Sequence, residues 1–85
     1  MAGRLTPETT AVHEAGHAVA AMLCGVRVRR VRLTGDGGGV CVCEPLPTDN
    51  PRKSLRTALL ITAAGDAAED AIELLELAGA EPWRL

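Results

Sequence analysis

The 85-residue sequence has no phenylalanine and no tyrosine, and Trp83 is its single tryptophan. Aromatic rings usually supply much of the buried area of a core. Here the core must come from the valine, leucine, isoleucine and alanine that make up most of the 47% apolar content. We therefore expect one small domain over residues 1–85, of modest stability, to which a bound metal or a partner subunit would contribute.

Long apolar runs and a strong charge of one sign are also missing. No stretch approaches the roughly twenty apolar residues needed to span a membrane, and the formal net charge of −2 gives no general reason to expect nucleic acid as a partner. The first residues lack the charged-then-apolar pattern of a signal peptide, and three cysteines are an odd number. The corresponding expectation is a reduced, cytoplasmic setting.

Charge is nevertheless distributed unevenly. Four arginines lie close together: Arg27, Arg29, Arg30 and Arg32. Acidic residues gather further along the chain: Asp66, Glu69, Asp70, Glu73, Glu76 and Glu81. The simpler interpretation is two solvated faces that attract each other, and the alternative is a basic groove for a peptide or a phosphate.

The apolar pattern predicts an α+β fold that begins with a helix. This helix should start at Pro7, with Thr6 as its N-cap, and end at Gly25. Its buried stripe should contain five residues: Val12, Ala15, Val19, Met22 and Leu23.

A β-hairpin should follow, with strands at residues 26–33 and 40–44 and a glycine-rich turn at 35–39. The alternation in the first strand changes parity at Arg29 and Arg30, where a bulge or break would keep the apolar side chains inside. Those side chains are Val26, Val28, Val31 and Leu33.

Helical periodicity resumes at Pro51, with Asn50 as the cap, and stops before Gly79. Its apolar residues are Leu55, Ala58, Leu59, Thr62, Ile72, Leu74, Leu75 and Leu77. Gly65, followed by Asp66 and Glu69 in the form of a capping box, predicts a kink or a restart, so two helices and one bent helix are both open. Residues 81–85 should form a short tail.

The chemistry is concentrated in residues 13–17, His-Glu-Ala-Gly-His. A four-residue step on a helix returns to nearly the same face one turn on, so His13 and His17 can bind one ion from one rigid element. Glu14 projects from the adjoining face, where it can take a proton from a zinc-bound water. The motif predicts Zn²⁺ binding. It also predicts, as a separate and more specific claim, hydrolysis of peptide bonds with Glu14 as the general base.

A catalytic zinc usually has three protein ligands and an open position for water. Glu69 is our candidate for the third ligand, with Asp66 and Asp70 as alternatives. Each of them could equally be a solvated residue, and Glu69 or Asp70 could instead orient a ligand histidine. A second subunit is another source of the ligand, which makes a homo-oligomer a candidate state.

The cysteines are weaker candidates for metal binding. Cys24 lies seven residues after His17, about 10 Å along the helix axis, which is too far to share an ion, so we expect it to be buried at the helix end. Cys41 and Cys43 share one face of a strand, but no second Cys or His pair completes a site. We interpret them as core or partly exposed thiols.

Residues 13–20, His-Glu-Ala-Gly-His-Ala-Val-Ala, precede Gly25, an arginine-valine strand, a glycine-rich turn and residues 64–69, Ala-Gly-Asp-Ala-Ala-Glu. This order of features resembles the peptidase domain of the FtsH family of membrane-linked, ATP-dependent zinc proteases, over about residues 7–73. The resemblance implies a small zincin-like domain, zinc bound by His13 and His17, Glu14 as the base, and a peptide or unfolded protein as the substrate.

The chain departs from that family in several respects. Asp66 stands where the family has an arginine, and the family's third ligand, an aspartate further downstream, has no counterpart, nor has its ATPase module. The sequence thus resembles a minimal or truncated relative. It predicts a zinc metallopeptidase whose arginine-bearing strand aligns an extended peptide by β-augmentation. The alternative is a non-catalytic regulatory or assembly module; an intact Glu14 favours the enzyme, and the missing ligand favours the module.

Overall fold

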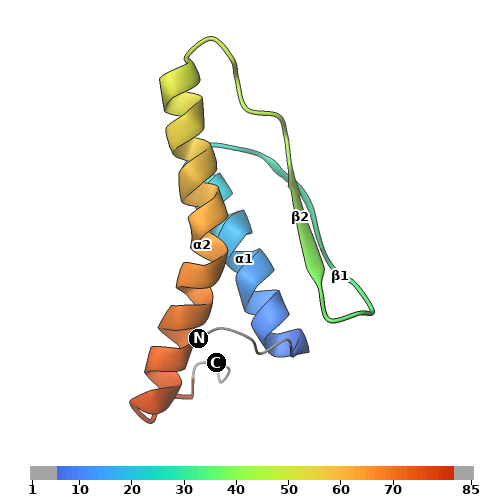
Figure 1. Ribbon diagram of the computed structural model, residues 1–85, viewed down its shortest axis with the longest axis vertical. Helices are drawn as coiled ribbons and strands as arrows, with labels where there is room; N and C mark the ends of the chain where they lie inside the picture. Colours follow the sequence, from blue (N-terminus) through green and yellow to red (C-terminus); the bar gives the residue numbers. More distant parts are fainter. Residues whose placement is uncertain (1–5, 82–85) are drawn as a thin grey trace.

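The computed structural model describes residues 6–81, which form a helix, a β-hairpin and a long second helix (Figure 1). Helix α1 (Pro7–Leu23) begins where predicted: the Thr6 hydroxyl accepts a hydrogen bond from the Thr9 backbone N–H at 3.1 Å. The helix ends at its cap, Cys24, and Gly25 follows with φ +76°, a left-handed conformation that glycine adopts at little cost. Both ends of the predicted helix are confirmed.

Strands β1 (Val28–Leu33) and β2 (Gly39–Cys43) pair antiparallel, and the register shifts between Val28 and Arg30. The predicted bulge is therefore confirmed. The expectation that all four apolar residues of the first strand lie inside is wrong, because Val31 and Leu33 are exposed. Helix α1 lies against both strands, and no element of residues 6–81 other than α1 packs on the hairpin, so Val31 and Leu33 are covered only in part.

Helix α2 (Pro51–Leu77) is one continuous helix, so the expected restart at Gly65 does not occur. Asn50 caps its start by accepting from the Lys53 N–H, and Gly79, with φ +88°, follows its end. The capping box expected between Asp66 and Glu69 is absent from α2, because the Glu69 carboxylate bonds to His13 instead.

The two helices cross closely, and α1 lies between α2 and the hairpin (Figure 1). Gly16 makes this approach possible: a Cβ atom there would lie 2.5 Å from the Ala64 carbonyl oxygen and 2.8 Å from the Ala68 Cβ. Any side chain at position 16 would push the helices apart.

The buried stripe expected along α1 is wrong. Among the described residues, Ala21 is the one buried hydrophobic side chain, and the buried polar side chains are those of Thr10 and Glu14. By contrast, Leu23 is 84% exposed, and Cys24, which we expected to be buried, is exposed. The reason is that α2 and the hairpin contact the polar side of α1, which carries the motif.

The expected apolar stripe of α1 instead faces an open groove of about 610 Å³ between the two helices. On α2, five leucines expected in an apolar face are also exposed: Leu55, Leu59, Leu74, Leu75 and Leu77. Within residues 6–81, most of the large apolar side chains are therefore exposed to solvent.

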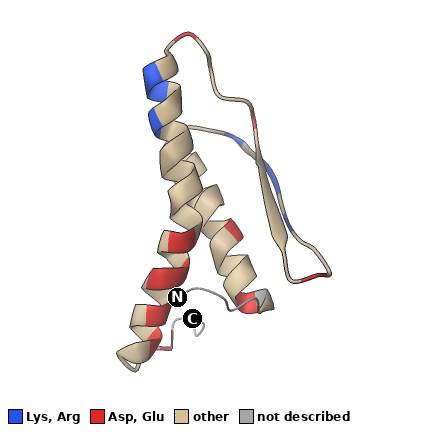
Figure 2. Ribbon diagram, viewed as in Figure 1, with Lys and Arg blue, Asp and Glu red and all other residues tan. Residues whose placement is uncertain are grey.

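Charged residues lie on separate parts of the molecule (Figure 2). Basic residues occupy β1 and the first turns of α2, whereas acidic residues occupy the second half of α2. The arginines of β1 are exposed, and Arg29 pairs with Glu44 at 3.4 Å between Nε and Oε1. The expected tail lies mostly beyond the described residues. Within residues 6–81 neither helix has the length and apolar character required to cross a bilayer.

Candidate metal centre

The middle turns of α1 place His13 and His17 one above the other, facing α2. Their ring centroids are 4.6 Å apart and the rings are nearly perpendicular, at 86°. This arrangement follows from the four-residue spacing on a regular helix. The structure therefore brings the two predicted histidine ligands together.

Each imidazole makes a hydrogen bond through Nδ1 to α2. The His17 Nδ1 lies 2.6 Å from the carbonyl oxygen of Ile61, and the His13 Nδ1 lies 2.7 Å from Oε2 of Glu69. A carbonyl oxygen only accepts, so Nδ1 of His17 carries the proton and donates it. An ionised Glu69 imposes the same tautomer on His13. With Nδ1 as the donor in both rings, Nε2 is the nitrogen whose lone pair is available to a metal.

The two Nε2 atoms converge on the backbone of Gly65 in α2. A Cβ atom at this position would lie 2.7 Å from Nε2 of His13 and 2.7 Å from Nε2 of His17. Gly65 is buried, and the absence of a side chain there lets both nitrogen atoms lie this close to the α2 backbone. Two imidazole nitrogens held side by side on one helix are donor atoms of the kind that zinc binds.

Glu14 lies on the side of α1 that faces the hairpin and is 6% exposed. Gly39 of β2 packs directly on it, since a Cβ there would lie 2.7 Å from Cγ and 3.0 Å from Oε2 of Glu14. Thr10 secures the same contact, because its hydroxyl donates to the Gly37 carbonyl at 2.7 Å. The hairpin thus holds Glu14 in place. Around α1, the histidines lie between Glu14 on one side and the open groove on the other.

The acidic candidates for a third ligand differ in position. Glu69 and Asp66 both approach Nδ1 of His13, at 2.7 and 3.4 Å, and the three residues form a group that could hold a metal ion. The Asp66 side chain is 85% exposed and that of Glu69 17%. Asp70 is exposed and lies outside this group. Whether Glu69 is a ligand stays a prediction. Its carboxylate contacts Nδ1 of His13, whereas Nε2 of the same ring faces Gly65.

Cys41 is a neighbour of Glu14 that the sequence interpretation missed. Burial raises the pKa of its thiol to about 11, and the adjacent Cys43 and the negative charge of Glu14 act in the same direction. Strand parity carried the signal, because Gly39, Cys41 and Cys43 share one face of β2 and Gly39 contacts Glu14. Both thiols are half-buried, as expected.

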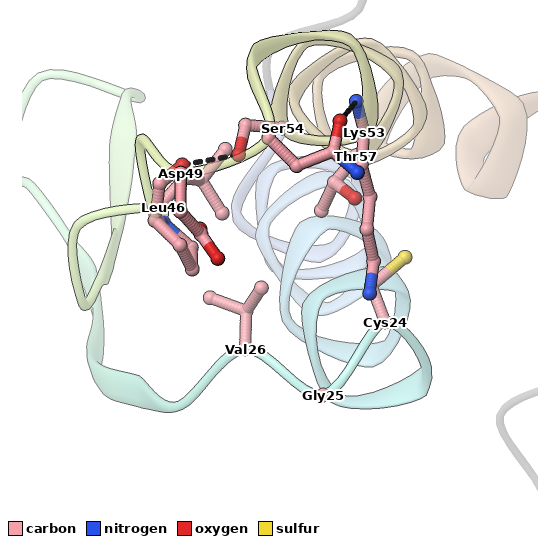
Figure 3. Close-up of a pocket in the computed structure, with 10 residues that line it drawn as sticks. Cys24, Gly25, Val26, Leu46, Asp49, Lys53, Ser54 and Thr57 are labelled. Carbon is pink, nitrogen blue, oxygen red and sulfur yellow. Dashed lines mark hydrogen bonds between the residues drawn. The ribbon is translucent and has the colours of Figure 1, made fainter.

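A separate hollow of about 350 Å³ lies between the end of α1 and the start of α2 (Figure 3). Cys24, Lys53 and Thr57 lie on one side of it and Leu46 and Asp49 on the other, and the Ser54 hydroxyl donates to the Pro47 carbonyl. It contains no residue of the motif, so it is distinct from the candidate metal centre.

Comparison with protein-family models identifies a family for this chain. The family model described as Peptidase M50B-like, a metallopeptidase family, matches residues 5–67, which include the whole motif and the Gly65 contact. The match is to this family and not to FtsH specifically. Neither the curated proteins nor the solved structures contain a match. Since the matched segment covers well over half of the sequence, the chain belongs to the Peptidase M50B-like family.

Proposed function

We propose that this chain is a zinc metallopeptidase in which the Nε2 atoms of His13 and His17 bind the metal. The observation that carries the proposal is the pair of Nδ1 hydrogen bonds, which leaves both Nε2 lone pairs free beside Gly65. Family membership supports the same chemistry. When bound, zinc supplies a Lewis acid that polarises the scissile carbonyl and makes water acidic enough to react near neutral pH.

Glu14 acts as the general base. Its carboxylate accepts a proton from the attacking water and delivers it to the nitrogen of the leaving amine. The close contact with Gly39 restricts its rotamers, so the carboxylate is positioned before substrate binds. A structural zinc site has no need of such a base, which favours the enzyme over a non-catalytic module.

Glu69 is a positioning residue in this proposal. Its hydrogen bond to Nδ1 keeps the proton on that nitrogen and fixes the orientation of the His13 ring. The Ile61 carbonyl has the same role for His17. This assignment replaces ligation by Glu69 with orientation, an alternative that the sequence already left open.

The substrate is an extended peptide. Among residues 6–81, β1 pairs only with β2, so its second edge is open to an added strand. Arg30 and Arg32 are exposed and would favour acidic side chains in the bound segment. We place the reaction in the cytoplasm, a setting with which three free thiols are compatible.

Metal analysis and a peptidase assay test the proposal together. The purified chain, a Glu14→Gln variant and a His17→Ala variant are compared, with Glu8→Gln as a control because Glu8 is an exposed acid of the same helix. We expect zinc in all but His17→Ala, and cleavage of an unfolded protein only by the parent and the control. Zinc without cleavage in the parent identifies a non-catalytic module with a structural metal, and a parent that binds no zinc refutes the peptidase and leaves a non-catalytic module without metal.

A further inference from the structure

The outward face of α2 carries an exposed apolar stripe with a symmetric spacing. Its members are Leu60, Ala63, Ala67, Ala71 and Leu74, all of them exposed. The steps between them are three, four, four and three residues, so they share one side of the helix. The pattern reads the same from either end, with Ala67 at its centre.

From this pattern we infer that two copies of the chain pair through α2 in an antiparallel dimer, with the two-fold axis near Ala67. The axis would place Leu60 of each copy opposite Leu74 of the other, and Ala63 opposite Ala71. A two-fold interface requires such self-complementarity. Alanines at its centre allow the two helices to approach closely.

Charge favours the antiparallel orientation. The first turns of α2 carry Arg52, Lys53 and Arg56, whereas acidic residues occupy its second half (Figure 2). Antiparallel pairing sets the basic end of each helix beside the acidic end of the other, and it also opposes the helix dipoles. A parallel pair would bring like charges together at both ends.

The groove beside the stripe offers space for the leucines of a second copy. Ala67 and Ala71 form its α2 edge, and Val12, Val19 and Leu23 belong to its α1 side. With about 610 Å³ of open, almost entirely apolar space, it can receive Leu60 and Leu74 of the second copy. This face is separate from the hairpin side that holds Glu14.

The exposed area of the chain is consistent with a missing partner. It amounts to 6268 Å² for 8.9 kDa, whereas a compact monomer of this mass exposes about 4,800 Å². The excess exceeds the roughly 800 Å² that each partner buries in an interface of standard size. A second copy on the α2 stripe would therefore cover surface that the isolated fold leaves open.

Sedimentation equilibrium of the full chain over a wide range of concentrations tests the dimer. We expect a mass that rises from 8.9 kDa to twice that value. Ala67→Arg places two cations on the axis and should raise the dissociation constant about 100-fold. The matched control is Thr62→Arg, since Thr62 is exposed about 140° around the helix from Ala67 and should leave association unchanged. Circular dichroism verifies that both variants keep their helices.

Disulfide trapping tests the orientation without a disruptive substitution. A mixture of Ala63→Cys and Ala71→Cys chains should form a mixed disulfide, identified by mass spectrometry of the linked peptides, while neither variant alone should link through the new cysteine. Self-linking of Ala63→Cys would overturn the antiparallel arrangement. A parent chain that stays monomeric at every concentration, or an unchanged dimer in Ala67→Arg, would overturn the inference and leave the face to a different partner.

Discussion

Nδ1 of His13 and Oε2 of Glu69 lie 2.7 Å apart although 56 residues separate them in the chain. This bond ties the motif helix to α2 and decides which nitrogen of His13 is free. It also gives Glu69 a role that can be separated experimentally from metal ligation.

Replacing Glu69 distinguishes orientation from ligation. Glu69→Ala removes the acceptor and should lower zinc affinity by about 10- to 100-fold, whereas Glu69→Gln keeps an oxygen that can accept from Nδ1 and should cost less than about tenfold. Zinc affinity is measured by competition with a chromophoric chelator. If Glu69→Gln loses zinc as completely as His17→Ala, then Glu69 is a ligand.

Gly65→Ala tests the close approach of α2 to the imidazoles. The new methyl group would collide with both Nε2 atoms at 2.7 Å, so we expect a loss of about 1–3 kcal/mol in the free energy of unfolding and loss of zinc binding. Urea unfolding followed by circular dichroism measures the first effect. Gly35→Ala is the control, because a Cβ there meets nothing within 4 Å; equal effects at both positions would contradict the steric explanation.

Thr10→Val should loosen the hairpin from α1 while keeping the shape of the side chain. It removes the 2.7 Å bond to the Gly37 carbonyl, which should lower the free energy of unfolding by about 0.5–1.5 kcal/mol. Amide exchange in β2 should accelerate as well. The same substitution at Thr48, an exposed loop residue, should change neither quantity. Unaltered exchange in Thr10→Val would show that the bond does not anchor the hairpin.

Alkaline pH should destabilise the fold through Cys41. Its pKa is about 11 in the folded chain against a reference of 9.0, so between these values the unfolded state releases a proton that the folded state keeps. The free energy of unfolding then falls as pH rises from 9 towards 11. Cys41→Ala should reduce this decline, as measured by urea unfolding at both ends of the interval. A decline of the same size in the variant would assign the effect to other groups.

Local signals in the sequence were sufficient to predict where the helices and strands lie and that His13 and His17 lie side by side. Thr6 and Pro7 mark a helix start by their own chemistry, Gly25 and Gly79 mark ends, and the parity change at Arg29 revealed the bulge. Each of these signals depends on neighbouring residues alone. The spacing of His13 and His17 is likewise a property of a single helix.

The packing could not be predicted in the same way. The apolar stripe of α1 indicated a core, yet α2 and the hairpin contact the other side of the helix because Gly16 and Gly39 permit close backbone approach there. Gly65 was interpreted as a kink or a restart, with one bent helix left open, although it lies within an unbroken helix and makes a tertiary contact. A single sequence does not reveal which element a glycine will meet.

The contact at Gly65 also fixes how far α2 can slide along α1. A slip of one residue moves a helix by about 1.5 Å and would present Ala64 or Asp66 to the rings instead. The Ile61 carbonyl, one helical turn before Gly65, would leave His17 at the same time. The two imidazoles therefore fix the axial register of α1 against α2, because both rings find their hydrogen-bond partners in this register alone.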